Sequence, residues 1–240
     1  MKQPHDNWAK FYDFVYEKSF GNYYNSLTKE NLKVINDILS NGSIIDFGAG
    51  TGRLTIPLKK QDYQITAVEK SYGMIEELKK KSLMNNLEIP VFNCSISDYV
   101  NGEADLALAL FTVLSYSITE DELSKNIENI SRHLKPNGHF FFDLPGMQFF
   151  NLRELPFLQS SECRRSVKLN NVDGQIYSYN EKCSGIFNGE EFSYEDVFRI
   201  RYWEISTLDK LLSENGFKDT LKSFPQFNST GSTYKLYQKL

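Results

Sequence analysis

A glycine-rich turn flanked by two acidic residues carries the clearest chemistry in this sequence. The segment Asp46-Phe47-Gly48-Ala49-Gly50-Thr51-Gly52 follows a short apolar run and precedes a helical pattern. Its glycines allow a tight turn and let a ligand approach main-chain N–H groups at the start of a helix. Glu69 ends the next apolar run, where a carboxylate can accept hydrogen bonds from both hydroxyls of a ribose. Together these features predict a nucleoside-binding unit.

The spacing of the glycines distinguishes between two nucleoside ligands. In the dinucleotide fingerprint GxGxxG counted from Gly48, the third glycine position is occupied by Arg53. Asp46 stands two residues before the first glycine, where a carboxylate would face a pyrophosphate poorly but would suit an ammonium and a sulfonium. The charge argument favours S-adenosylmethionine over NAD, so a dehydrogenase is the least supported alternative.

Strands and helices must alternate to position these residues. We expect strands at residues 44–47, 64–68, 90–94, 104–111 and 139–144, and helices at 53–60, 71–83 and 121–134. The run 104–111 is nearly all apolar, as in a strand buried on both faces. This pattern predicts an α/β fold with a mostly parallel sheet and helices on both faces. Residues 7–39 are expected to be helical.

The alternation stops after Pro145. Three strand-like stretches at 163–169, 175–185 and 191–203 are joined by turn signals at 170–174 and 188–189, which predicts an antiparallel meander. A helix at 207–215 and an antiparallel pair at 217–224 and 233–238 should close the chain. The predicted domains are a core at 1–150 and 204–240 and an antiparallel β insertion at 151–203. Arg164 and Arg165 are expected on a solvated edge of that insertion.

Composition sets the wider limits. The chain has 240 residues, 40% hydrophobic and 24% charged, and a formal net charge of −4, which argues against nucleic-acid binding through bulk charge. No apolar run is long enough to span a bilayer, and the polar N-terminus lacks a signal peptide. Three widely spaced cysteines signal neither a disulfide framework nor a zinc site. We therefore expect a cytoplasmic protein with no membrane and no metal.

Several segments in order resemble the class I, seven-stranded S-adenosylmethionine-dependent methyltransferases. The resemblance covers residues 8–240 and implies a Rossmann-like, seven-stranded sheet. The segments are Ile44–Gly52 (first motif), Val68–Met74 (ribose-binding acid and following helix), Cys94–Tyr99 (adenine-binding region), Leu110–Tyr116 (after strand four) and His133–Phe140 (turn before strand five).

The resemblance implies a set of cofactor-binding residues. It gives them as Asp46, Gly48, Ala49, Gly50, Arg53, Glu69, Lys70, Met74, Ser95, Ile96, Leu110 and Phe111. The acid with which the family contacts adenine is replaced by Ser95, whose hydroxyl is shorter and uncharged. Ile96 keeps the apolar and backbone N–H parts of that contact.

A finer resemblance is to small-molecule enzymes, namely amino-sugar N,N-dimethyltransferases and glycine-type N-methyltransferases. It rests on the aromatic N-terminus, the segment Phe111–Tyr116 and the late β insertion, which in that group helps to cover the acceptor pocket and can contribute to a homodimer. It implies metal-independent, in-line transfer of a methyl group to a small acceptor, an amine rather than a hydroxyl, with S-adenosylhomocysteine as product.

The sequence does not identify a general base. Tyr12, Tyr16 and Tyr116 are the candidates to line the pocket mouth, and His133 and His139 are expected to be structural. Two alternatives stay open: a tRNA-modifying methyltransferase, which shares the core, and a non-catalytic S-adenosylmethionine-binding regulatory protein, which the serine at position 95 and the missing base motivate.

Overall fold

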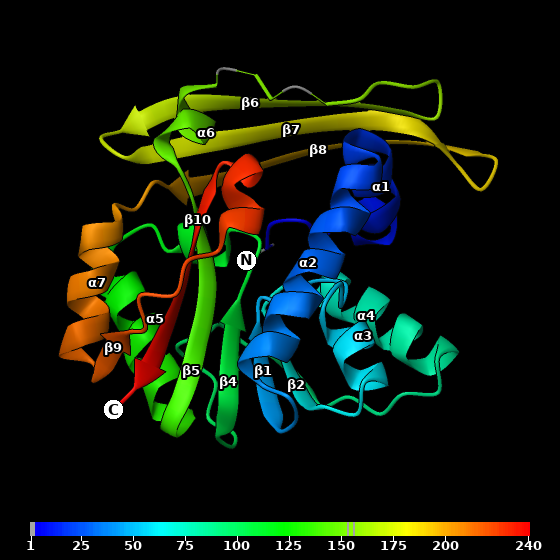
Figure 1. Ribbon diagram of the computed structural model, residues 1–240. Helices are drawn as coiled ribbons and strands as arrows, with labels where there is room; N and C mark the ends of the chain where they lie inside the picture. Colours follow the sequence, from blue (N-terminus) through cyan, green and yellow to red (C-terminus); the bar gives the residue numbers. More distant parts are fainter. Residues whose placement is uncertain (1–2, 153, 156) are drawn as a thin grey trace.

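A seven-stranded, mostly parallel sheet forms the centre of the protein (Figure 1). The computed structural model describes residues 3–152, 154–155 and 157–240. The strand order is β3-β2-β1-β4-β5-β10-β9. The strands are β1 (Ser43–Phe47), β2 (Gln64–Glu69), β3 (Val91–Asn93), β4 (Ala104–Ala109), β5 (Leu134–Pro145), β9 (Phe217–Asp219) and β10 (Ser232–Lys239). β10 pairs antiparallel with both β5 and β9, and the other described pairs of this sheet are parallel, which confirms the predicted fold class.

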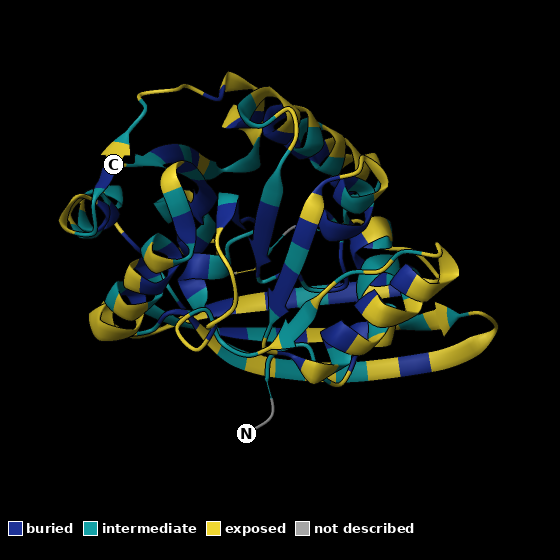
Figure 2. Ribbon diagram, turned by 90° about the horizontal axis from the view of Figure 1, so that it is seen from below, coloured by how far each residue is buried: buried dark blue, intermediate teal, exposed yellow. Residues whose placement is uncertain are grey.

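Helices cover both faces of this sheet because alternate strand residues point to opposite sides. Ile44 of β1 packs in one apolar cluster with α2 (Asn22–Ile38) and α3 (Thr55–Lys60). Its neighbour Ile45 packs in another with α5 (Glu120–Arg132) and α7 (Ile205–Glu214). The helix α4 (Tyr72–Met84) lies on the same face as α2 and α3, where Leu78 packs against Ala67. Figure 2 shows buried residues along the central strands and exposed residues on the outer sides of the helices.

The N-terminal helical region is interrupted, contrary to the expected continuous helix. It consists of η1 (Ala9–Phe11), α1 (Tyr12–Phe20) and α2, with the break at Gly21. Gly21 has φ 57° and ψ −138°, a conformation that residues with a Cβ rarely adopt. The break separates α1 from α2, so the two segments pack against different sheets.

The predicted meander forms a second sheet of its own. Its strands β6 (Cys163–Asp173), β7 (Ile176–Phe187) and β8 (Glu190–Arg201) pair in the order β6-β7-β8. Asn188 and Gly189 both have positive φ, at 53° and 84°, which suits the tight turn between β7 and β8. In Figure 1 this sheet extends across the end of the main sheet at which β4 and β5 finish, with α1 and α6 (Met147–Asn151) beneath it.

Two further expectations need correction. The strand expected at 217–224 ends at Asp219, because Leu221 adopts a left-handed φ of 57° and Pro225 opens the short helix η3 (Pro225–Thr230). Arg165 is not on a solvated edge: strand alternation exposes Arg164 and turns Arg165 into the interior, where it is 2% exposed.

Within the described residues, no helix has the length and apolar character needed to cross a membrane.

Candidate functional site

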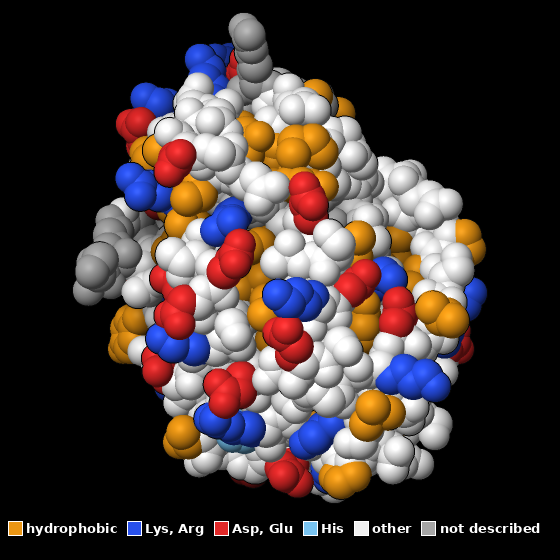
Figure 3. Space-filling model, turned by 90° about the vertical axis from the view of Figure 1, so that its left-hand side faces the viewer, with side chains coloured by type: hydrophobic (Ala, Val, Ile, Leu, Met, Phe, Trp, Pro, Cys, Tyr) orange, Lys and Arg blue, Asp and Glu red, His pale blue; other side chains and the backbone are white. Residues whose placement is uncertain are grey.

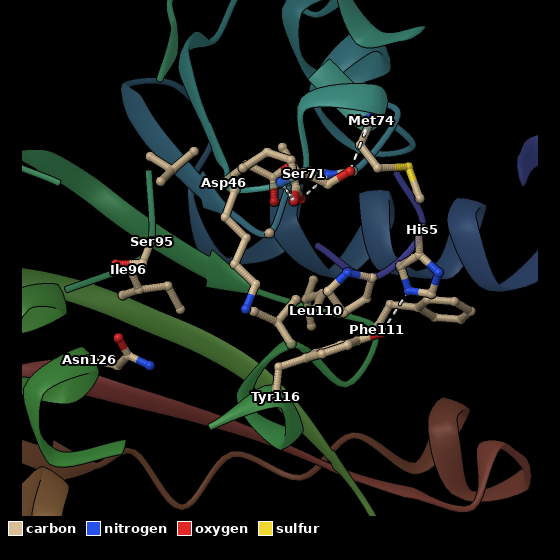
Figure 4. A pocket seen from close by; sticks show the side chains of 18 of the residues that line it. His5, Asp46, Ser71, Met74, Ser95, Ile96, Leu110, Phe111, Tyr116 and Asn126 are labelled. Atoms are coloured by element: carbon tan, nitrogen blue, oxygen red, sulfur yellow. Dashed lines mark hydrogen bonds between the residues drawn. The ribbon is translucent and has the colours of Figure 1, made fainter. Parts of the chain in front are cut away.

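A cavity of about 410 Å³ opens where β1, β2 and β4 end. This edge, between β1 and β4, is the point where the strand order of the sheet reverses, a common location for ligand sites in such folds. All the residues that the sequence proposes for cofactor binding line this cavity: Asp46, Gly48, Ala49, Gly50, Arg53, Glu69, Lys70, Met74, Ser95, Ile96, Leu110 and Phe111. The fold therefore brings the whole predicted set to one place (Figure 4).

Asp46 is the more deeply buried of the two acids, at 4% exposure. The hydroxyl of Thr55 donates a hydrogen bond to Asp46 Oδ2 over 2.6 Å. Burial nevertheless raises the pKa of Asp46 to about 6, because the charged form loses its hydration. A buried carboxylate of this kind is suited to bind a cationic ammonium.

Glu69 holds the glycine turn and the start of α4 together. Its Oε2 accepts a hydrogen bond from the Gly50 N–H over 2.9 Å, and its Oε1 accepts one from the Ser71 N–H over 2.8 Å. Burial raises the pKa of Glu69, while these two N–H groups act in the opposite direction. Each carboxylate oxygen has a second lone pair, so Glu69 can still accept hydroxyl hydrogens from a ligand.

The buried Asp46 predicts a pH-dependent stability difference. The carboxyl stays protonated to about pH 6 in the folded chain but ionises near 3.8 when unfolded, so stability falls as pH rises through this window. This difference in the Asp46 pKa between the folded and unfolded chain corresponds to about 3 kcal/mol in the free energy of unfolding. We therefore expect the free energy of unfolding of Asp46→Asn, measured with urea relative to that of the wild type, to increase by this amount when the pH is raised from 3.5 to 8. The exposed Asp37→Asn is the control, and an equal response of the two variants would contradict the prediction.

Gly48 and Gly50 offer a matched pair for testing the turn. A Cβ at Gly48 would lie 2.5 Å from Val113 Cγ2, whereas one at Gly50 would meet no heavy atom within 4 Å. Both residues have positive φ, which costs alanine about 1–2 kcal/mol. We expect Gly48→Ala to lower the free energy of unfolding by about 1–3 kcal/mol more than Gly50→Ala does. Equal losses in denaturant unfolding would show that Val113 moves aside freely.

The end of β4 is held in an unusual backbone conformation. Phe111 and Thr112 have φ of 74° and 66°, values that non-glycine residues rarely adopt. The buried Asp143 stabilises them by accepting hydrogen bonds from both N–H groups through Oδ1. The Phe111 ring lies 5.1 Å from the guanidinium of Arg53, which also lines the cavity. Strained backbone at the rim of a cavity is typical of functional sites.

Ser95 is engaged within its own turn. Its hydroxyl donates to Asp98 Oδ2 over 2.6 Å and accepts the Asp98 N–H over 3.2 Å. Ile96 lines the same part of the cavity, with Asn126 of α5 nearby in Figure 4. Polar contacts at this end can therefore come from Asn126, a residue that the sequence interpretation did not consider.

A second cavity of about 310 Å³ adjoins the first. Both are lined by the same four residues: His5, Tyr12, Phe111 and Tyr116. Most of its other wall is aromatic or apolar and comes from the N-terminal helices, the end of β5 and the region after it, the three-stranded sheet and β10. These residues are Tyr16, Phe20, Tyr23, Leu27, Pro145, Phe149, Leu152, Leu155, Phe157, Tyr179, Phe198, Ile200 and Tyr234. Of the three predicted tyrosines, Tyr12 and Tyr116 lie at the junction of the cavities, and Tyr16 lines only the second.

Sequence reasoning missed the polar residues of the second cavity. His5, Asp143 and Arg165 come from segments far apart in the chain, and none belongs to a motif. His133 and His139 lie outside both cavity linings. Within the described part of the chain, no group of three or more His, Cys, Asp or Glu side chains is arranged to hold a metal ion.

Part of the chain matches a known protein domain. Residues 44–138 match the model of a methyltransferase domain. An uncharacterized methyltransferase of Bacillus subtilis is 32% identical over 96 residues, which are 40% of each protein, so the match spans less than half of that relative.

Solved structures share the fold along almost the whole chain. An S-adenosylmethionine-dependent methyltransferase from Clostridium acetobutylicum superposes with a TM-score of 0.80 at 19% identity, covering 96% of this chain and 98% of that one. The sugar N-methyltransferase KedS8 from Streptoalloteichus superposes with a TM-score of 0.72 at 14% identity, covering 100% and 94%. Residues 44–138 therefore match a methyltransferase domain, and the chain shares the fold of solved S-adenosylmethionine-dependent methyltransferases along almost its whole length.

Proposed function

We propose that this protein transfers a methyl group from S-adenosylmethionine to the nitrogen of a small-molecule acceptor. The observation that carries the proposal is the pair of adjoining cavities, one with the carboxylates of Asp46 and Glu69 and one with aromatic walls, which meet at Tyr12 and Tyr116. The cofactor supplies an electrophilic methyl group on a sulfonium. The protein supplies orientation, exclusion of water and the surrounding charges.

The donors and acceptors of the first cavity fit the proposed cofactor. Asp46 would hold the ammonium, Glu69 the ribose hydroxyls and the Gly48–Gly50 turn the amino-acid portion, with Met74, Leu110 and Ile96 as apolar contacts. Because only an ionised Asp46 attracts an ammonium, affinity should fall as the pH drops below about 6. The volume of about 410 Å³ is in the range of small-molecule sites.

An amine acceptor is favoured over a hydroxyl by the character of the second cavity. Aromatic faces attract protonated amines, and the buried Asp143 adds a carboxylate to the wall. The sugar N-methyltransferase with this fold supports the same choice.

We also propose that the insertion, residues 151–203, acts as the cover on the acceptor side, because Arg165, Tyr179 and Phe198 line the second cavity.

A homodimer through the insertion is part of the proposal. Val172, Ile186 and Val197 lie on its three strands and are 46–56% exposed, so pairing of two copies there would remove apolar surface from water. Sedimentation velocity of the wild type and of Val197→Lys tests this: a dimer that the lysine dissociates is expected, and a wild-type monomer would contradict it.

The proposed reaction is tested by calorimetry with S-adenosylhomocysteine and by turnover of labelled S-adenosylmethionine with a panel of amino sugars, amino acids and aromatic amines, each beside its hydroxyl analogue. Binding and turnover of an amine are expected. Absence of S-adenosylhomocysteine binding would overturn the proposal, and binding without turnover would favour the regulatory alternative. On the face shown in Figure 3, Lys and Arg side chains are interspersed with Asp and Glu, so that face offers no continuous basic patch for tRNA.

A further inference from the structure

A histidine, a tyrosine and an aspartate from three distant segments meet where the two cavities join. The Nε2 atom of His5 lies 2.9 Å from the hydroxyl oxygen of Tyr116, and Figure 4 shows the two side chains pointing toward one another. The Nδ1 atom of His5 lies 3.5 Å from Oδ2 of Asp196 on β8. His5 and Tyr116 both line both cavities. Neither His5 nor Asp196 belongs to the glycine-turn motif.

Asp196 is fixed in its position toward the imidazole. Its Oδ2 accepts hydrogen bonds from the His5 backbone N–H over 2.7 Å and from Trp8 Nε1–H over 3.0 Å. The His5 Nδ1 has no hydrogen-bond partner among the described residues, and the Asp196 carboxylate is the acidic group at ion-pair distance from it. A proton on Nδ1 is therefore favoured electrostatically, and this tautomer leaves the lone pair on Nε2 directed at the Tyr116 hydroxyl.

Surrounding rings hold the imidazole in this orientation. Trp8, Tyr12 and Phe198 lie edge-on to His5, with ring centroids 5.2, 5.6 and 5.1 Å away. The backbone of His5 has a φ of 71°, a strained value for a non-glycine residue. A strained residue that is fixed by packing and by a carboxylate is the arrangement expected of a functional side chain.

We propose that Tyr116 and His5 form a proton relay for the acceptor, oriented by Asp196. This deepens the proposed function and rests on it. As the acceptor nitrogen gains the methyl group, its proton moves to the Tyr116 oxygen while the Tyr116 proton moves to Nε2 of His5. The positive charge that arrives with the methyl group thus leaves as the imidazolium of His5, opposite Asp196. Tyr116 touches the acceptor cavity and is the catalytic residue; Asp196 is a positioning residue.

The electrostatic setting agrees with a neutral imidazole that can take up a proton. Burial lowers the pKa of His5, and the nearby carboxylates of Glu181 and Asp196 act in the opposite direction. Burial also raises the pKa of Tyr116 far above its usual range, so Tyr116 passes a proton on instead of ionising. The charged and titratable groups that face His5 are Asp6 on its own segment, Tyr12 on α1, Tyr116, Arg165 on β6, Glu181 on β7 and Asp196 on β8.

The first test needs no acceptor. ¹⁵N NMR of the three histidines, with His5→Gln used for assignment, reports the tautomer of His5 in the protein with and without S-adenosylhomocysteine. We expect a neutral Nδ1–H tautomer at pH 8, an Nε2 signal that shifts in Tyr116→Phe and an altered tautomer ratio in Asp196→Asn. An Nε2–H tautomer, or an Nε2 chemical shift that is the same in Tyr116→Phe as in the wild type, would overturn the relay.

The second test uses turnover with the amine panel. We expect His5→Gln and Tyr116→Phe to lower kcat by about 10²–10⁴-fold, far more than they lower the affinity for S-adenosylhomocysteine. We also expect His5→Gln to abolish the low-pH limb of the kcat profile. His139→Gln, outside both cavities, is the control. A kcat within twofold of wild type in His5→Gln would overturn the relay. If the wild type did not bind S-adenosylhomocysteine, the proposed function would be refuted instead. The NMR measurement without ligand would still show whether His5 and Tyr116 have the geometry of the relay.

Discussion

Replacing Glu69 with glutamine is expected to weaken S-adenosylhomocysteine binding by at least about a hundredfold. Hydrogen bonds to a charged group contribute about 1.5–3 kcal/mol each, and two ribose hydroxyls would lose a charged acceptor. The substitution also disturbs the turn. Glutamine carries one amide NH₂ in place of a carboxylate oxygen, so it would direct donor hydrogens at the N–H of either Gly50 or Ser71. Calorimetry measures the affinity directly.

A matched control separates this effect from a general loss of charge. Glu88→Gln removes the same charge from an exposed position in the segment between α4 and β3, and it should bind S-adenosylhomocysteine as the wild type does. Urea unfolding of the Glu69→Gln variant checks that the chain remains folded under the binding conditions. An affinity within threefold of wild type in the folded variant would show that Glu69 serves only to tie the turn to α4.

The lining of the first cavity could be predicted from the sequence because the residues that form it lie close together in the chain. The first acid, the glycines and Glu69 lie within one strand–turn–helix–strand unit, so their spacing determines their arrangement. Gly48 is tied to the neighbouring strand by a backbone hydrogen bond to Val68. The alternation of strands and helices likewise predicted the parallel sheet, since each apolar run had to be buried on one or both faces.

The lining of the second cavity could not be predicted because it is assembled from distant segments. Asp143 reaches the backbone at Phe111 across 32 positions, and Asp196 reaches His5 across 191. No periodicity in a single sequence reports such pairings. The break at Gly21 was missed for a related reason: apolar residues keep a helical spacing on both sides of it, and its positive φ becomes visible only in the structure.

Arg165 illustrates how the period of a strand decides between two interpretations of the same residue type. A pair of arginines on a meander suggested a solvated edge, yet in a half-buried strand consecutive residues must face opposite sides. Arg165 faces inward and pairs with Glu181, its Nε donating to Oε1 over 2.7 Å. Both side chains are essentially inaccessible, at 1% and 0% exposure. Removing one partner of such a buried ion pair strongly destabilises the fold, because the other charge stays buried without its counter-charge.

Arg165→Met is therefore expected to lower the free energy of unfolding by about 3–5 kcal/mol, because it leaves the Glu181 carboxylate buried and unpaired. It also removes the guanidinium that lies 4.2 Å from the Tyr16 ring and 4.3 Å from the Phe157 ring. Arg164→Met, one residue earlier and exposed, should change stability by no more than about 0.5 kcal/mol in the same urea titration.

The double variant Arg165→Met/Glu181→Leu separates charge from packing. If the unpaired carboxylate is the main cost, removing both charges should restore most of the lost stability. If the stacking of Arg165 between Tyr16 and Phe157 dominates, the double variant should stay as unstable as Arg165→Met. Tyr194 donates to Glu181 Oε1 over 2.9 Å and would lose that partner in the double variant, so recovery should remain incomplete by about 1 kcal/mol. A double variant less stable than Arg165→Met would contradict the electrostatic account, since it carries no buried charge at either position.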